Sequence, residues 1–218
     1  MKCHICTSKC QKAGKQSTGV QKYLCTSCKK YQQVDYRYKA CQQSEKRLFL
    51  KCLKVGNSLS GIRVITGIAI STQLRWIRKL GNEVKPRNTL RSNDVYELDE
   101  LCTYVQNKQK RRWVISAISR TTGQIVAIKV GTRTKYNLAL VVNKLLQLSP
   151  RAIYTDRLSA YRNLIPKHLH RIKFRGINKI ERFHLTLRTH IKRLNRKTIC
   201  FSKKEDLLEG IIRIYAWE

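Results

Sequence analysis

Residues 95–101 read Val-Tyr-Glu-Leu-Asp-Glu-Leu and carry an acid, Asp99, in the middle of a strand-like run. Short runs of this kind, bounded by polar turn residues, are typical of β-strands. Two further runs follow at residues 112–118 and 124–130, and Thr121-Thr122-Gly123 is a short connection between them. The three runs together predict an antiparallel meander that starts with the strand of Asp99.

The segments after the meander alternate between helix and strand. Residues 137–148 have helical periodicity, and residues 152–156 form a short apolar run that ends in Asp156. A long basic helix is predicted over residues 177–194. Three antiparallel strands, a helix, a further strand and flanking helices are the order of elements in ribonuclease-H-like folds. We therefore expect residues 93–218 to form an α/β domain of this class.

Acidic side chains are scarce in this part of the chain. Between Leu101 and Lys204 the only carboxylates are Asp156 and Glu181. Acids kept at a strand end and on a helix, in so basic a stretch, are candidates for binding a cation. Mg²⁺ takes oxygen ligands, and two such ions held by three carboxylates can promote reactions at a phosphodiester. With Asp99 as the third acid, the sequence predicts a catalytic site for Mg²⁺ or Mn²⁺.

Each of these acids also has an ordinary structural interpretation. Asp156 could cap a helix that starts near residue 158, and Glu181 could pair with a basic residue one turn away. Asp99 has a neighbour, Glu97, on the same face of the predicted strand, whereas alternation places Glu100 on the opposite face. We expect Glu97 and Glu100 to lie at the rim of the site or to support its ligands from behind.

The protein carries a large positive charge. Its 46 Lys+Arg and 13 Asp+Glu give a formal net charge of +33, which favours a polyanionic partner, with nucleic acid as the first candidate. A membrane surface is a weaker candidate because the basic residues are spread along the whole chain. No run approaches the roughly 18 apolar residues that span a bilayer. We therefore expect no membrane partner and a cytoplasmic, nucleoid-associated protein.

Four of the nine cysteines have the spacing of a zinc site. They form two Cys-x-x-Cys pairs separated by the 18 residues from Thr7 to Leu24. The expected ligands are Cys3, Cys6, Cys25 and Cys28. Four thiolates suit the tetrahedral geometry of structural Zn²⁺, so residues 1–40 are predicted to fold as a zinc-binding knuckle module. Unligated thiols are the alternative, and His4 or Cys10 could replace one ligand.

Four further cysteines are predicted to have a structural role. We expect them to be small buried residues without chemistry of their own. They are Cys41, Cys52, Cys102 and Cys200.

Residues 44–81 have the periodicity of a helix-turn-helix module. A helix is predicted from Ser44 to Val55, and two short helices are predicted around the glycine at position 67. In such a unit the last helix enters the major groove of DNA. The side chains expected to face DNA are Thr72, Gln73, Arg75, Arg78 and Lys79. A purely structural helical bundle would show the same periodicity, and residues 82–92 are predicted to be a linker.

Several short motifs together resemble the transposases of the IS-one family of bacterial insertion sequences, which belong to the DDE group. The motifs are Glu97-Leu98-Asp99-Glu100, Tyr154-Thr155-Asp156, Lys179-Ile180-Glu181-Arg182 and Phe201-Ser202-Lys203. The two cysteine pairs and the helix-turn-helix are similar to that family as well, so the resemblance covers nearly the whole chain. The chain departs from the expected pattern at Arg157-Leu158 and at Phe183-His184.

The resemblance implies a DNA transposase. Asp99, Asp156 and Glu181 match the acidic triad of the family, which implies Mg²⁺-dependent cleavage at terminal inverted repeats and joining to target DNA. It also implies a homodimer on double-stranded DNA. The rival interpretations are a zinc and helix-turn-helix regulator with a degenerate catalytic domain and a basic protein of a ribonucleoprotein particle.

The predicted helix of Glu181 also carries basic side chains. His184 falls on the same face as Glu181 and could contact the scissile phosphate, assist the metal site or simply be satisfied by a neighbour. Other side chains are expected to hold backbone phosphates without reading sequence. They are Arg182, Arg188, Lys192, Arg193, Arg196 and Lys197.

Overall fold

The computed structural model describes residues 1–218 apart from 35–39, 41, 87–92, 173–175, 196 and 199. The chain forms two compact units, Met1–Leu48 and Phe49–Glu218, called here the N-terminal unit and the C-terminal unit. Helix α1 (Gln43–Lys54) spans the boundary between them.

The N-terminal unit is built around cysteines. Strands β1 (Cys10–Lys15), β2 (Gln21–Cys25) and β3 (Tyr31–Gln32) form an antiparallel sheet in that order. Among the described residues of this unit, the buried apolar cluster consists of Cys3, Cys10 and Cys25. So small an apolar core contributes little stability, which makes a metal the natural source of the remainder.

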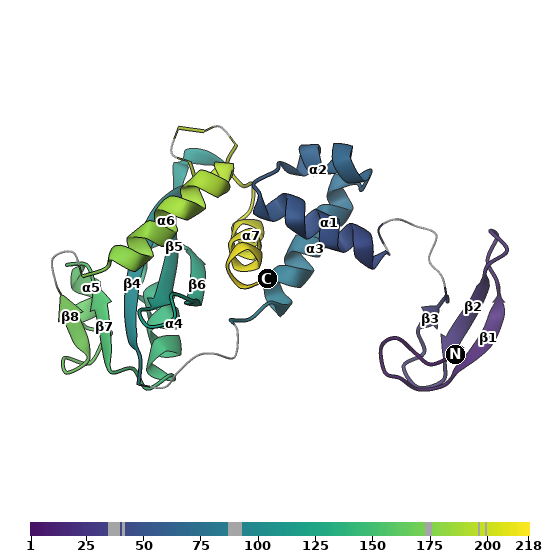
Figure 1. Cartoon of the computed structure of the whole chain (residues 1–218), viewed down its shortest axis with the longest axis horizontal. Coiled ribbons are helices and arrows are strands. Elements are labelled where there is room, and N and C mark those ends of the chain that lie inside the picture. The colour runs from purple at the N-terminus through teal and green to yellow at the C-terminus, as the bar shows by residue number, and fades with distance from the viewer. Residues whose placement is uncertain (35–39, 41, 87–92, 173–175, 196, 199) are drawn as a thin grey trace. The chain divides into compact units, whose positions relative to one another are not determined.

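A five-stranded mixed sheet forms the centre of the C-terminal unit (Figure 1). Its strands are β4 (Val95–Val105), β5 (Asn107–Ser119), β6 (Ile125–Gly131), β7 (Ala152–Thr155) and β8 (His170–Ile172), in the order β6-β5-β4-β7-β8. The first three are antiparallel neighbours, whereas β7 runs parallel to β4 and β8 runs parallel to β7. The predicted meander and the strand that ends at Asp156 are both present, and the mixed α/β class is confirmed.

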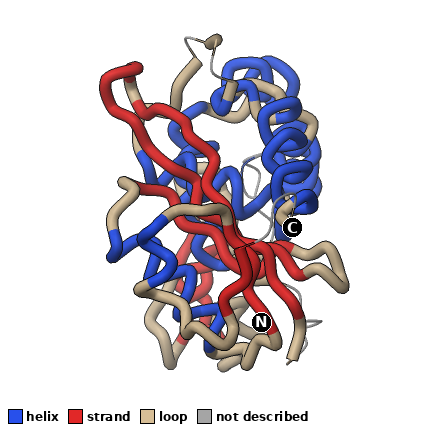
Figure 2. Tube along the Cα trace, turned by 90° about the vertical axis from the view of Figure 1, so that its left-hand side faces the viewer, coloured by secondary structure: helices blue, strands red, loops and turns tan. Residues whose placement is uncertain are grey.

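Helices cover both faces of this sheet (Figure 2). They are α4 (Lys135–Leu146), the short α5 (Ser159–Arg162), α6 (Asn178–His190), the 3-10 turn η2 (Lys192–Leu194) and α7 (Glu205–Trp217). The helix predicted over residues 177–194 ends early, because the backbone of Ile191 leaves the helical region with φ −105° and ψ 90°. This turn buries the Ile191 and Leu194 side chains together. None of the described helices has the length and apolar character needed to cross a membrane.

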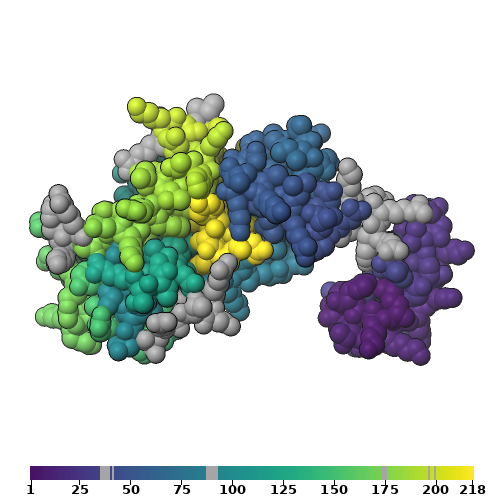
Figure 3. Space-filling model, in the orientation of Figure 1, coloured from purple at the N-terminus to yellow at the C-terminus, as the bar shows by residue number. Residues whose placement is uncertain are grey.

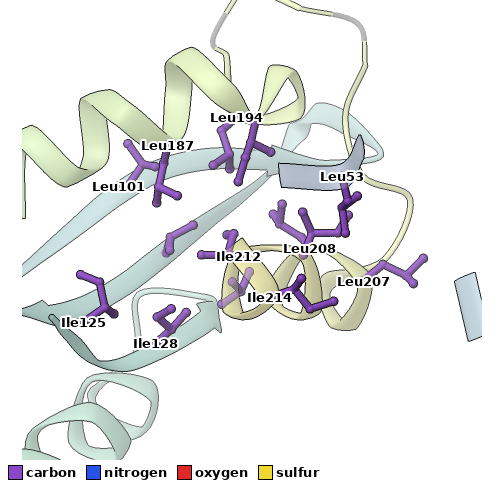
Figure 4. Close-up of a cluster of buried hydrophobic side chains, with 14 of the residues drawn as sticks. Leu53, Leu101, Ile125, Ile128, Leu187, Leu194, Leu207, Leu208, Ile212 and Ile214 are labelled. Carbon is purple, nitrogen blue, oxygen red and sulfur yellow. The ribbon is translucent and has the colours of Figure 1, made fainter. Parts of the chain in front are cut away.

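Alternation along β4 divides the core in two. Tyr96 and Leu98 point to one face and pack in a cluster with residues of α4. Leu101 and Val105 point to the other face and join a larger cluster that includes α6 and α7 (Figure 4). A strand with two buried faces therefore fixes which acid of the 95–101 segment meets which helix.

Two more helices precede the sheet in the sequence. Helix α2 (Leu59–Thr66) ends at Gly67, whose φ of 72° makes a left-handed cap that suits glycine, and α3 (Ile70–Glu83) follows after a short turn. The predicted pair of helices around a glycine turn is thus present. Ile62 of α2 and Ile77 of α3 belong to the same buried cluster as the residues of α7.

The helical segment is therefore not a compact unit separate from the sheet. Helix α7, yellow in Figure 3, lies between the blue helical segment and the sheet. At the crossing of α3 and α7, a Cβ atom built on Gly81 would lie 2.4 Å from the Cα atom of Gly210. The predicted modules 44–81 and 93–218 consequently share one core, and residues 87–92 of the predicted linker lie outside the described residues.

Candidate functional site

Asp99 and Asp156 are brought together by the pairing of two parallel strands. The register of β4 and β7 runs from Val95↔Ala152 to Glu97↔Tyr154, and its continuation places Asp156 beside Asp99. Carboxylate oxygens of Asp99, Glu100 and Asp156 all lie within 4.8 Å of one another. Three convergent carboxylates offer hard oxygen ligands, so the donor chemistry fits Mg²⁺ or Mn²⁺.

The structure does not bring Glu181 into that group. Glu181 lies in the first turn of α6 and is exposed to solvent. The residue four positions onward is Leu185, so the alternative interpretation of Glu181 as half of an ion pair at that spacing does not apply. Within the described part of the chain, Glu181 makes no side-chain hydrogen bond or ion pair.

His184 connects α6 to the strand of Asp99. Its Nδ1 atom lies 3.3 Å from Oδ2 of Asp99, and its Nε2 atom lies 2.7 Å from Oγ of Ser116. The geometry suits a ring that donates from Nδ1 to Asp99 and accepts the Ser116 hydroxyl proton at Nε2. His184 is only 6% exposed, which favours satisfaction by protein neighbours among the alternatives open for this side chain. It orients an acid of the site.

Glu97 caps α6 from the neighbouring strand. Its Oε2 accepts hydrogen bonds from the backbone N–H groups of Lys179 at 2.9 Å and Ile180 at 3.0 Å. Its Oε1 accepts from Nε of Arg120 at 2.7 Å. Helix α6 has no side-chain cap of its own, so Glu97 satisfies two of the first free N–H groups of the helix. Of the two positions predicted for Glu97, the structure has the supporting one behind the site, because the residue is 2% exposed.

Glu100 is buried on the opposite face of β4, as alternation predicts. Its Oε2 accepts from Nε and Nη2 of Arg133, at 3.0 and 2.7 Å, and its Oε1 accepts from the Tyr161 hydroxyl. Burial raises the pKa of Glu100, while the hydrogen bonds from Tyr161 and Arg133 act against that rise. Glu100 is therefore buried and bonded to Arg133 and Tyr161, while one of its oxygens still lies within 4.8 Å of oxygens of Asp99 and Asp156.

Asp156 uses one oxygen in the local turn. Its Oδ1 accepts from the backbone N–H of Leu158 at 2.9 Å, which is the turn role that its position before a short helix allows. Among the described residues, its Oδ2 has a longer contact, 4.0 Å to Nη2 of Arg133. Arg133 and Tyr161 were not predicted as site residues from the sequence. Arg133 follows β6, which runs in the same direction as β4, so it lies toward the end of the sheet where β4 ends.

The four predicted zinc ligands converge in the N-terminal unit. Sulfur atoms of Cys3, Cys6, Cys25 and Cys28 lie within 4.8 Å of one another, with 3.7 Å between Cys3 and Cys28 and 3.4 Å between Cys6 and Cys25. Although burial alone would raise it, the pKa of Cys3 is lowered to about 5 by hydrogen bonds from backbone N–H groups and from Gln32. Four sulfur atoms at these distances offer the soft donor set that fits tetrahedral Zn²⁺.

Cys10, Cys52, Cys102, Cys200 and His4 lie outside this group. Cys10 is buried nearby, and burial raises the pKa of its thiol. Of those predicted to be small buried residues, Cys52 is buried, Cys102 is half-buried and Cys200 is exposed, so the prediction is wrong for Cys200. Cys41 lies outside the described residues.

The side chains of α3 that were predicted to face DNA divide into two groups. Arg75 and Lys79 are exposed and Thr72 is half-buried. Gln73 is fully buried, and its Nε2 donates to the Ile68 carbonyl at 2.8 Å, so the prediction of a DNA contact is wrong for this residue. It braces the turn between the two helices.

Arg78 and Trp76 of the same helix have protein partners. Nε of Arg78 lies 2.8 Å from Oδ2 of Asp206 on α7. The ring of Trp76 packs edge-on against Phe49, with 5.2 Å between centroids, as expected for a packing residue. One face of α3 is therefore occupied by the protein itself.

The basic residues predicted to hold phosphates lie on and after α6. Arg182, Lys192 and Lys197 are exposed, whereas Arg188 and Arg193 are half-buried. Arg193 donates to Oγ of Ser202 at 3.3 Å. Arg196 lies outside the described residues.

Comparison with known proteins gives one family for the C-terminal part of the chain. The family described as IS1 transposase matches residues 94–217. The chain is 35% identical over 118 residues to the insertion element iso-IS1n protein InsB of Shigella dysenteriae, covering 54% of this chain and 90% of that protein. It is 34% identical over 119 residues to the insertion element IS1 protein InsB of Shigella flexneri, covering 55% and 91%.

Two solved structures show a more distant similarity. The HTLV-2 integrase catalytic core domain in complex with magnesium has a TM-score of 0.40 at 12% identity, over 58% of this chain and 84% of that chain. The simian T-cell lymphotropic virus intasome in complex with PP2A regulatory subunit B56 gamma has a TM-score of 0.39 at 14% identity, over 80% and 67%. Both are too distant to say more about this chain.

Proposed function

The chain belongs to the IS1 transposase family, and from this premise we propose that it cleaves DNA at terminal inverted repeats and joins the ends to target DNA. The observation that carries the proposal is the pairing of Asp99 and Asp156 on adjacent parallel strands, with carboxylate oxygens within 4.8 Å. The order of strands and helices supports a ribonuclease-H-like catalytic domain.

Asp99 and Asp156 would hold Mg²⁺ or Mn²⁺, with Glu181 as the third ligand. When bound, such ions stabilise charge that develops at a phosphodiester and activate the attacking oxygen. The residues of this chain prepare the ligands: His184 orients Asp99, and Glu97 holds the first turn of α6, where Glu181 lies. Glu181 is exposed, so its carboxylate is accessible from solvent.

The rest of the protein would bind the DNA. A net charge of +33 favours a phosphate backbone, and exposed side chains such as Arg75, Lys79 and Arg182 are suited to phosphate contacts. Helix α3 is the proposed reader of the terminal repeats, through its exposed face. A homodimer would bring two DNA ends together, and Zn²⁺ at the four cysteines would hold the N-terminal unit.

Replacement of Asp156 by Asn tests the catalytic assignment. With Mg²⁺ and duplex DNA that carries the terminal repeats, we expect the unaltered protein to nick and join strands and Asp156→Asn to lose roughly 10³-fold in rate while binding the same DNA. Glu205→Gln, which removes a carboxylate of α7 outside the site, is the matched control and should stay active. Equal activity of Asp156→Asn would overturn the assignment. Binding without any cleavage by the unaltered protein would identify a DNA-binding regulator.

The third ligand needs a separate comparison, because Glu100 lies within the group of oxygens and Glu181 does not. We expect Glu181→Gln to lose cleavage nearly as completely as Asp156→Asn. We expect Glu100→Gln to keep measurable cleavage, since Glu100 is already bonded to Arg133 and Tyr161. Strand-cleavage rates at several Mg²⁺ concentrations decide the question. An active Glu181→Gln beside an inactive Glu100→Gln would make Glu100 the third ligand.

A further inference from the structure

Arg133 is held rigidly next to the acid pair. It follows β6 and comes directly before Thr134, whose side chain caps α4. The guanidinium carbon lies 4.5 Å from the centre of the Trp113 ring, and two nitrogens, Nε and Nη2, donate to the same oxygen of Glu100. The Glu100 side chain is 1% exposed. Stacking on one side and a buried carboxylate on the other leave this arginine little rotamer freedom.

Some N–H donors of the Arg133 guanidinium have no acceptor among the described residues. Of the five N–H groups of an arginine, those engaged here lie on Nε and Nη2, and no hydrogen bond of Nη1 is found within the described part of the chain. A third of the Arg133 side chain is exposed, with a relative accessibility of 33%. The distance of 4.0 Å from Nη2 to Asp156 is too long for a hydrogen bond.

We propose that Arg133 binds a backbone phosphate of the DNA strand that lies at the Asp99–Asp156 pair, and this inference rests on the proposed function. A planar fork of N–H donors matches the oxygens of a phosphate, and a fork that is already fixed loses little entropy on binding. Glu100, Tyr161 and Trp113 act as the support that aims the fork. Arg133 is thus a positioning residue that sets where along the strand the acid pair meets the DNA.

Neutral substitutions in the DNA test this contact directly. Duplex DNA with the terminal repeats is prepared with single methylphosphonates, which remove one phosphate charge at a time, and binding is measured in Ca²⁺ to prevent cleavage. We expect the unaltered protein to lose about tenfold in affinity at one or two positions beside the cleavage site. Arg133→Gln should bind unmodified DNA about tenfold more weakly and show no further loss at those positions. Its slope of log affinity against log salt should be smaller by about one.

The matched control is Lys135→Gln, which removes an exposed cation on the first turn of α4. It should remain sensitive to the same methylphosphonates as the unaltered protein. Arg133→Lys keeps the charge without the fork, and we expect it to recover only part of the affinity. If Arg133→Gln keeps the full methylphosphonate pattern of the unaltered protein, the inference is overturned.

Loss of Arg133 leaves Glu100 buried without its partner, so a folding defect must be separated from a lost contact. The double variant Arg133→Gln, Glu100→Gln removes both charges and should fold, as checked by its thermal unfolding. It should show the same missing positions as Arg133→Gln. Failure of the proposed function is a separate result. A protein that binds the DNA but never cleaves it would overturn the proposed function, whereas the methylphosphonate pattern alone decides whether Arg133 contacts a phosphate.

Discussion

Glu97, Asp99 and Glu100 lie close together in the sequence of β4, yet each contacts a different group of the protein. Glu97 accepts from the N-terminus of α6, Asp99 meets His184 of the same helix, and Glu100 faces Arg133 on the other side of the sheet. The pleat of the strand decides this division, because residues two apart share a face and adjacent residues do not. The strand geometry that places Asp99 at the site thus also places Glu97 and Glu100, the two acids that support it.

At the scale of the residue, Glu97→Ala is the most informative change outside the acid pair. It leaves the N–H groups of Lys179 and Ile180 without an acceptor and Arg120 without its ion partner. We expect a loss on the order of 3 kcal/mol in the free energy of unfolding, measured by urea denaturation. Glu97→Gln keeps one acceptor oxygen and should lose less. A loss below about 0.5 kcal/mol for Glu97→Ala would contradict the capping role.

The sequence predicts some of these residue roles and misses others. Asp99 and Asp156 could be grouped in advance because acids are rare around them and because the order of elements is that of ribonuclease-H-like folds. The burial of Gln73 could not be predicted, since a polar side chain on a helix normally faces solvent. Its carbonyl partner at Ile68 exists only once the turn before α3 is folded.

At the scale of the element, patterns of apolar residues predict the long strands and helices well. The meander of β4, β5 and β6 and the helix α4 follow directly from periodicity. The three-residue strand β8 is too short and too polar for such a pattern, and it forms because β7 offers it a parallel edge. Helix α6 ends at His190 rather than continuing, because burial of Ile191 and Leu194 favours a turn over further helix.

The contact between α3 and α7 depends on two glycines. A Cβ atom on Gly81 would lie 2.4 Å from the Gly210 backbone, closer than real side chains approach. Alanine favours a helix over glycine by about 1 kcal/mol. We nevertheless expect Gly81→Ala to destabilise the protein by about 1–3 kcal/mol, because the two helices must move apart.

Gly61 in α2 provides the control for this prediction. A Cβ atom there would meet only the Oγ of Ser58, at 3.3 Å. The thermal unfolding of both alanine variants is measured. Gly61→Ala should be neutral or stabilising, as helix propensity alone predicts. If both alanine variants changed the melting temperature equally, the close crossing of α3 and α7 would not be the reason for glycine at position 81.

At the scale of the whole molecule, the chain separates a small unit that depends on cysteines from a large unit that has an apolar core. The C-terminal unit buries two clusters of aliphatic and aromatic side chains against the sheet. The described core of the N-terminal unit contains three buried cysteines. Sequence predicts this contrast through the Cys-x-x-Cys spacing. It does not predict that the helical segment joins the large core, because the close contact of Gly81 with Gly210 of α7 joins residues far apart in the sequence.

Removal of zinc should therefore unfold one unit and spare the other. We expect about one Zn²⁺ per chain in the purified protein, and its removal by a chelator should unfold the backbone of residues 1–40 so that trypsin cleaves after the lysines there. A fragment that begins near residue 49 should survive, because the core of the C-terminal unit contains no residue of the four-sulfur group. Cys3→Ser should behave like the chelated protein. Cys10→Ser is the matched control, since Cys10 is equally buried but lies outside the group, and it should retain the metal. Less than about half an equivalent of zinc, together with a Cys3→Ser variant as resistant to trypsin as its parent, would show that the unit folds without the ion.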